Sequence, residues 1–141
     1  MLARLCQLIG TITPDNIAAA EVEQIQQCGM TMKKACNIKK LAEVVSTGAL
    51  NLQELRDLPD TEVIKRLVSL DGVGIWTAEM LLLFSLCRPD VVSYGDLAIR
   101  RGMMNLYGLK GITKTDFERY KKRYSPYGSV ASLYLWKLAT M

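Results

Sequence analysis

The chain has 141 residues and a mass of 15.8 kDa, which is the length of one ordinary domain. Half of its residues are hydrophobic and 23% are charged, which excludes a disordered tail. It contains no histidine, which excludes Ser-His-Asp and Cys-His nucleophiles, zinc sites built on imidazole and a histidine general base. The formal net charge of +4 favours a polyanionic partner.

Helix signals follow one another along the first half of the chain, and no alternating strand pattern interrupts them. Thr13 followed by Pro14 predicts a helix start, and Gly29 predicts a helix stop. Thr31 is expected to cap a helix that runs to about Gly48.

The second half continues in the same way. Asp60 predicts the start of a helix with an apolar face of Val63, Ile64, Leu67 and Val68. The segment from Ile75 to Leu86 is apolar nearly all round, which predicts a buried central helix. Three more helices are expected: from about Asp96 to Tyr107, from Thr113, whose capping box includes Asp116, and from Ser129 to Leu138. The sequence therefore predicts an all-α fold of about eight short helices, in a single domain over residues 1–141.

The four cysteines are spread along the chain without a C-x-x-C pair: Cys6, Cys28, Cys36 and Cys87. This spacing excludes a zinc ribbon and a cysteine-ligated iron–sulfur cluster, and we expect four reduced cysteines in the core. No apolar run approaches the ~20 residues that span a bilayer, and Arg4 breaks up the opening segment before it could form a signal peptide. We expect a cytoplasmic, nucleoid-associated protein that makes no membrane contact.

Positive charge is concentrated in the last third of the chain. From Asp96 to the C-terminus nine Lys or Arg stand against three acidic residues, a balance of +6 that leaves −2 for the rest. This asymmetry predicts one polyanion-facing side. For Lys121, Lys122 and Arg123 alone, a solvated helix face explains the charges equally well.

Two glycines, Gly72 and Gly74, lie between the helices expected at about residues 60–86. A turn that leads into a helix N-terminus leaves backbone amides free, and the helix dipole favours an anion there, so the pattern predicts a phosphate site. A tight turn between helices needs glycine in any case, so a purely structural explanation stays open. Trp76 follows at a position where its ring could face a cleft instead of the core.

Asp96 lies twenty residues after Trp76, at the start of a predicted helix. An aspartate there is most often an N-cap. The alternative is catalytic, because an ionised carboxylate can stabilise the positive charge that develops on a sugar when its glycosidic bond breaks.

Three segments together resemble a known family: residues 70–82 (LDGVGIWTAEMLL), residues 88–91 (RPDV) and residues 95–102 (GDLAIRRG). They look like the helix–hairpin–helix DNA glycosylases of the HhH-GPD superfamily, in the DNA-3-methyladenine glycosylase II branch. Similar segments on both sides extend the resemblance over nearly the whole chain. It implies a helix–hairpin–helix glycosylase domain, and a double-stranded DNA partner that carries an alkylated base.

The resemblance also implies roles for individual residues. Asp96 would be the catalytic carboxylate, and the base pocket would contain Trp76, Met80 and Tyr94, although core packing is the better explanation for Tyr94. DNA phosphate would be bound by Gly72, Gly74, Thr77, Arg100 and Arg101. Backbone carbonyls of Val68, Leu70 and Val73 would hold a Na⁺ or K⁺ ion, with no other cofactor and no Fe–S cluster. Related branches carry a Schiff-base lysine where Trp76 stands, so the resemblance implies a monofunctional enzyme.

The chain departs from the family pattern in three places, one of which is Ser93-Tyr94-Gly95 before Asp96, where many relatives have proline and a second acid. Family members have a substantial segment before the point where this chain begins, so one wall of the base cleft would be missing, and we expect the apolar surface left behind to favour a homo-oligomer. Gly128 stands where the resemblance leads us to expect arginine.

Three hypotheses therefore stay open. The first is a hydrolase that releases alkylated purines of the 3-methyladenine and 7-methylguanine type in base-excision repair. The second is a catalytically weak or inactive helix–hairpin–helix fragment that binds duplex backbone without sequence preference. The third is an all-α remnant that only self-associates.

Overall fold

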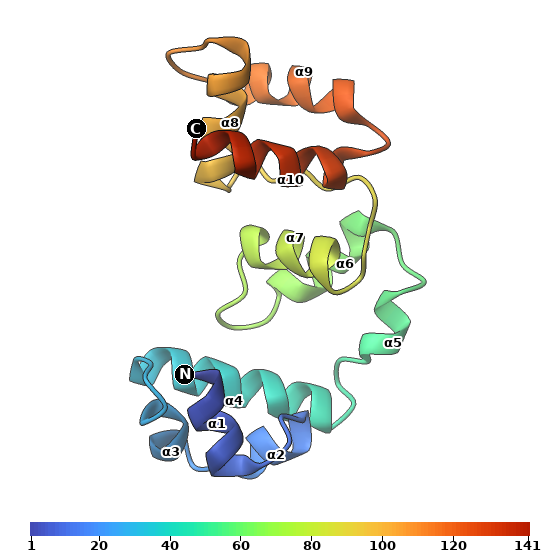
Figure 1. Ribbon diagram of the computed structural model, residues 1–141. Coiled ribbons are helices and arrows are strands. Elements are labelled where there is room, and N and C mark those ends of the chain that lie inside the picture. The colour runs from blue at the N-terminus through green and yellow to red at the C-terminus, as the bar shows by residue number, and fades with distance from the viewer. The chain divides into compact units, whose positions relative to one another are not determined.

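The computed structural model describes residues 1–141 and contains ten α-helices and no strand (Figure 1). The predicted all-α class is confirmed, with two helices more than expected. The stretch between Thr13 and Gly29 is divided into α2 (Pro14–Ala19) and α3 (Val22–Gln26). The division occurs because a capping box between Glu21 and Gln24 starts a new helix. The other addition is α5 (Leu52–Leu55), a single turn.

The chain forms two compact units. Residues 1–58 and 69–73 make the first unit, and residues 59–68 and 74–141 make the second. The single domain over residues 1–141 stays a prediction.

The first unit is built on α4 (Met32–Ser46), which Thr31 caps as predicted. Both α2 and α3 pack against α4, and α1 (Leu2–Ile9) precedes them in the chain. The centre of the packing is a small cluster of Ala20, Ile25 and Ala35. The small side chains of Ala20 and Ala35 leave room for Ile25, which is fully buried between the short helices and α4.

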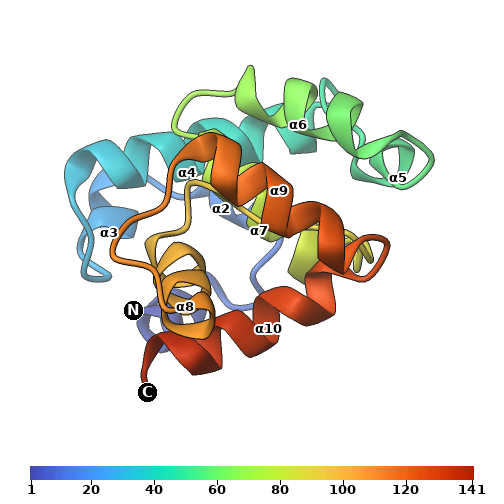
Figure 2. The ribbon, with the colours of Figure 1, turned by 90° about the horizontal axis from the view of Figure 1, so that it is seen from above.

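The second unit contains α6 (Asp60–Val68) and α7 (Ile75–Phe84), which pack against each other. It also contains α8 (Leu97–Tyr107), α9 (Lys114–Tyr124) and α10 (Gly128–Ala139), which lie side by side in both views (Figures 1 and 2). Their common core consists of Val92, Ile99, Met103, Phe117, Tyr120 and Leu135. The predicted caps Asp96 and Thr113 start α8 and α9.

The helix α7 is not buried all round, which corrects one prediction. Its buried residues are Ala78, Leu82 and Leu83, whereas Trp76 is 50% exposed and Phe84 is 60% exposed. Apolar residues occur on every side of this helix, so its sequence carries no signal for which side is covered. The uncovered side carries large aromatic rings.

Glycine lets α10 approach its neighbours closely at two points. At Gly102 in α8, a Cβ would lie 2.1 Å from the carbonyl oxygen of Leu135 in α10. At Gly128, a Cβ would lie 2.6 Å from Asp90 Oδ1 and 2.8 Å from Val92 Cγ2. These contacts explain why this chain has glycine at position 128, since the first turn of α10 lies directly against residues 90–92.

The cysteines are only partly core residues. Cys28 is buried, but Cys6 and Cys87 are exposed, so the prediction of four core cysteines is wrong for these two. Leu5 is the only buried residue of α1, which leaves the neighbouring Cys6 outside, and Cys87 lies in the turn after α7 with a left-handed backbone (φ 53°). None of the ten helices has both the length and the apolar character needed to cross a bilayer.

Candidate active site

Asp96 is the N-cap of α8, as its position in the sequence indicates. Its Oδ1 accepts a hydrogen bond from the backbone N–H of Ile99 at 3.0 Å, and the residue is only 8% exposed. A capping carboxylate next to the positive end of a helix dipole is stabilised in its charged form. The helix therefore fixes the orientation of this carboxylate inside the second unit.

Two tryptophan side chains converge on Asp96 from different helices. Trp76, at the start of α7, donates its indole N–H to Oδ2 at 2.9 Å. Trp136, on α10, donates its indole N–H to Oδ1 at 3.1 Å. The carboxylate thus joins α7, α8 and α10, and it is bound by the only two tryptophans in the chain.

These contacts explain the charge state of Asp96. Burial by itself would raise its pKa, but hydrogen bonds from Trp76, Ile99 N–H, Trp136 and Ala98 N–H outweigh burial and lower the pKa below its ordinary value. Asp96 is therefore ionised at neutral pH. Because donors already occupy both of its oxygens, it is a fixed negative charge and a weak proton acceptor.

Aromatic rings surround this charge. Phe84 of α7 stacks on Trp136, with ring centroids 5.7 Å apart and planes 8° from parallel. Trp76 and Phe84 are both exposed, at 50% and 60%. The second unit thus presents accessible aromatic side chains next to a buried carboxylate, an arrangement suited to a flat, positively charged ligand.

Trp136 is the site residue that sequence reasoning missed. Its helix was predicted, but the forty residues that separate it from Asp96 carry no signal for the contact. The available clue was chemical, because a tryptophan on a core-facing helix needs an acceptor for its N–H.

The other two predicted pocket residues lie differently. Tyr94 packs edge-on against the core residue Phe117 at 5.2 Å, and the Arg100 guanidinium lies 4.9 Å from its ring centre. This packing favours the core alternative for Tyr94. Met80 is half-buried on α7, one turn after Trp76 and therefore on the same side of the helix.

The fold requires glycine at only one of the two predicted hairpin positions, Gly72 and Gly74. Gly72, in the first unit, has φ +82°, and a Cβ there would lie 2.5 Å from Asn37 Nδ2, so the fold of this unit explains it. Gly74, in the second unit, caps α7 with an extended backbone, and a Cβ there would meet nothing within 4 Å. No side chain caps this helix start, and Thr77 lies in its first turn, half-buried. Nothing within the described chain requires glycine at position 74.

The predicted cation ligands are in the same region of the sequence. Val68 ends α6, and Leu70 O accepts a hydrogen bond from Val73 N–H at 3.3 Å in the following turn. The ion stays a prediction. The structure contains no group of at least three His, Cys, Asp or Glu side chains that could hold a metal ion.

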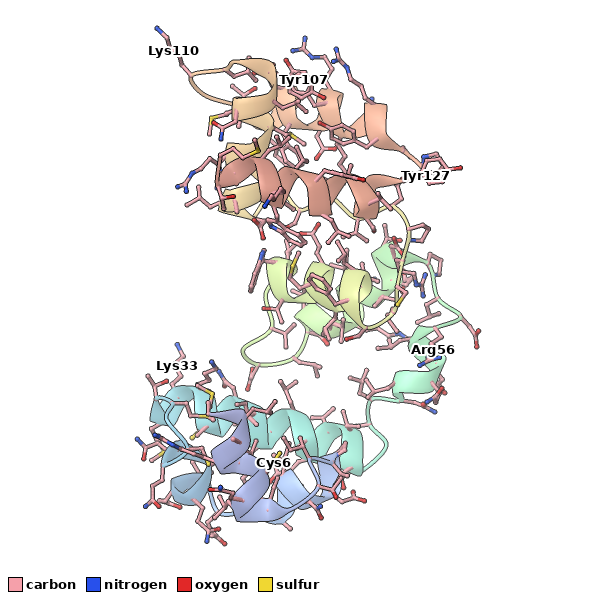
Figure 3. The ribbon with its side chains drawn as sticks, viewed as in Figure 1. Cys6, Lys33, Arg56, Tyr107, Lys110 and Tyr127 are labelled. Atoms are coloured by element: carbon pink, nitrogen blue, oxygen red, sulfur yellow. The ribbon has the colours of Figure 1, made fainter.

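The basic residues of the second unit lie in two environments. Arg100 is half-buried and its Nε has no hydrogen-bond partner, whereas Arg101 is exposed. On α9, Arg119 and Arg123 lie 5.2 and 5.0 Å from the ring centre of Tyr120. Lys110 projects from the loop between α8 and α9 (Figure 3). The guanidinium groups of α9 are thus ordered on aromatic rings, and the polyanion-facing role of this region stays a prediction.

Comparison with known proteins places the chain among DNA repair proteins. Residues 1–126 match the model of the HhH-GPD superfamily base excision DNA repair protein. The DNA-3-methyladenine glycosylase 1 of Schizosaccharomyces pombe is 36% identical over 131 residues, which are 92% of this chain and 58% of the relative. The chain spans about half the length of the curated relatives it matches.

Two solved structures are similar to nearly the whole chain. A DNA-3-methyladenine glycosidase from Bacillus halodurans has a TM-score of 0.87 at 38% identity, covering 98% of this chain and 65% of that one. A 3-methyladenine DNA glycosylase from Schizosaccharomyces pombe, in complex with abasic DNA, has a TM-score of 0.83 at 36% identity, covering 92% and 64%. The resemblance read from the sequence is confirmed, and the chain belongs to the HhH-GPD superfamily of base excision DNA repair proteins.

Proposed function

We propose that this chain is the catalytic part of a monofunctional DNA glycosylase that hydrolyses the N-glycosidic bond of alkylated purines after base flipping. The observation that carries the proposal is the buried, ionised Asp96 held by the indoles of Trp76 and Trp136. The reaction is a step of base-excision repair, and its substrate is duplex DNA that contains a base such as 3-methyladenine or 7-methylguanine.

The role of Asp96 in this reaction is electrostatic. As the base leaves, the sugar becomes oxocarbenium-like, and a fixed negative charge nearby lowers the energy of that state. A carboxylate with a lowered pKa and engaged oxygens is poorly suited to remove a proton from water. Its hydrogen bonds suit it instead to remain charged and immobile while the sugar becomes positive.

The leaving base needs no protonation, because an alkylated purine already carries a positive charge. This fits a chain that contains no histidine. The exposed faces of Trp76 and Phe84 are suited to bind a cationic ring, at about 0.5–2 kcal/mol for the cation–π attraction. A tryptophan at position 76 has no amine to form a Schiff base, so strand cleavage is not part of the proposed reaction.

DNA binding is proposed to use the start of α7. The uncapped N-terminus of this helix supplies amides for a phosphate, and the absence of a side chain at Gly74 leaves room for close approach. Carbonyl oxygens are ligands of the kind that Na⁺ or K⁺ binds, and the backbone carbonyls of Val68, Leu70 and Val73 stay the proposed ligands of such an ion. Both the phosphate and the ion belong to the proposal.

The second candidate is a fragment that binds the DNA backbone but releases bases weakly or not at all. The length comparison favours it, since the chain spans about half of its curated relatives. The half-exposed indole of Trp76 beside the buried, ionised carboxylate of Asp96 is suited to a cationic base, so this geometry favours the enzyme.

Single-turnover base release from a duplex with one 7-methylguanine separates the two candidates. We expect release by the parent and by Asp116→Asn, which alters an exposed carboxylate on α9, but a loss of at least about a hundredfold in Asp96→Asn. No release by the parent, with duplex binding that weakens as salt rises, would establish the fragment. Binding that is unchanged between low and high salt would refute both candidates.

A further inference from the structure

The loop that carries Asp96 contacts α7 at two points. Trp76 donates to Asp96 Oδ2 at 2.9 Å, and Ser93 Oγ donates to Glu79 Oε1 at 3.0 Å. The two α7 residues are three positions apart, and so are the two loop residues. Residues three apart on a helix lie on the same face, so the pair of bonds aligns the loop along one side of α7.

The second contact is inside the protein. Ser93 is fully buried, and Glu79 is half-buried with Ser93 as its hydrogen-bond partner. Burial raises the pKa of Glu79, against the Ser93 hydrogen bond and Lys121, which lower it, while Glu118 and Asp96 raise it further. Burying a carboxyl group costs free energy of folding unless a hydrogen bond compensates for the lost water, and here Ser93 provides that bond.

The backbone between Ser93 and Asp96 links the positions of these two residues. Ser93 O accepts a hydrogen bond from Asp96 N–H at 3.3 Å, which closes a turn over these residues. Gly95 lies within this turn, where a Cβ would be 3.6 Å from the Cβ of Trp76. A shift of Ser93 therefore displaces the carboxylate relative to the indole that binds it.

We propose that Glu79 is a positioning residue, which holds Ser93 so that the Ser93–Asp96 turn keeps the Asp96 carboxylate against the Trp76 indole. The proposal rests on the glycosylase function proposed above. The hydrogen bond is the operative feature, since Gln can accept from Ser93 as Glu does. The negative charge is not required.

The test uses the two indole N–H signals of the full chain in a nitrogen–proton correlation spectrum, because both tryptophans donate to Asp96. In the parent, both signals follow the titration of Asp96. We expect Glu79→Ala and Ser93→Ala to shift the Trp76 signal at neutral pH. Ser93→Ala, which keeps the carboxylate of Glu79, should also move the titration midpoint of this signal to higher pH. At neutral pH Glu79→Gln should keep the parental signal positions, and so should Glu118→Ala, which removes a nearby carboxylate with no bond to Ser93.

Base release supplies the second readout. We expect Glu79→Ala to slow single-turnover release by about tenfold to a hundredfold, as misplacement by about 1 Å does elsewhere, with duplex affinity unchanged. The double variant Glu79→Ala with Ser93→Ala should be little slower than either single variant, because both substitutions remove the same hydrogen bond. A normal Trp76 signal in Glu79→Ala, or a Glu79→Gln that resembles Glu79→Ala, overturns the proposal. If the parent releases no base while the spectra behave as described, the proposed function fails and the positioning role stands.

Discussion

The crossing of α8 and α10 at Gly102 leads to a quantitative prediction for Gly102→Ala. The new Cβ would lie 2.1 Å from Leu135 O, 2.8 Å from Leu135 C and 3.0 Å from Leu135 Cα. A carbon–oxygen contact needs roughly 3.3 Å, so α10 has to move away by about 1 Å. Every atom in the way belongs to the backbone, which cannot avoid the clash by changing rotamer.

Overpacking of this kind costs about 1–3 kcal/mol, and the better helix propensity of alanine offsets about 1 kcal/mol. Because the clash is with backbone atoms, we expect the upper end of this range, a net loss of about 2 kcal/mol, which lowers the midpoint of thermal unfolding by roughly 4–8 °C. The same displacement moves Trp136, the residue after Leu135, and so disturbs its bond to Asp96. The indole signal of Trp136 should therefore shift.

Thermal unfolding followed by circular dichroism measures the loss, with Gly111→Ala as the matched control. A Cβ at Gly111 would meet nothing within 4 Å, so this variant should unfold at or slightly above the parental midpoint. A Gly102→Ala protein that is as stable as the control, with an unchanged Trp136 signal, would refute the close crossing.

Three further predictions concern the site and its surroundings. Trp136→Phe removes one hydrogen-bond donor from Asp96 but keeps an aromatic ring that Phe84 can stack on, so the pKa of Asp96 should rise. If the Trp76 signal still titrates at the parental midpoint, the hydrogen bond from Trp136 to Asp96 is contradicted. Because folding lowers the pKa of Asp96, its stabilising effect is present above its ordinary value of 3.8 and is lost as the pH falls through the folded value. The stability difference between parent and Asp96→Asn, measured by urea unfolding, should therefore shrink toward acid, and a constant difference would count against the lowered pKa. Gly128→Arg should lower the thermal midpoint because its Cβ meets Asp90 and Val92, and unchanged stability with tighter duplex binding would mean that arginine fits there after all.

The helices themselves could be predicted because their signals are local. Four caps each accept a hydrogen bond from the backbone N–H three residues further on, so the cap and the helix start lie within a few positions of each other: Thr13, Thr31, Asp96 and Thr113. The break between α2 and α3 was missed even though its cause is also local. There the capping residue is Glu21, a less usual cap, and the box with Gln24 is only evident in the structure.

By itself the sequence determined the helical class, the position of Asp96 at a helix start and the family to which the chain belongs, since these depend on residue types at short spacings. Only the tertiary structure decided which side of the uniformly apolar α7 is covered, why position 128 is glycine, and which indoles reach Asp96. The contact of Trp136 with Asp96 spans forty residues, and it exists because α8 and α10 cross where Gly102 lets their backbones meet. Such a contact depends on how helices pack, and no periodicity within one helix specifies its partner.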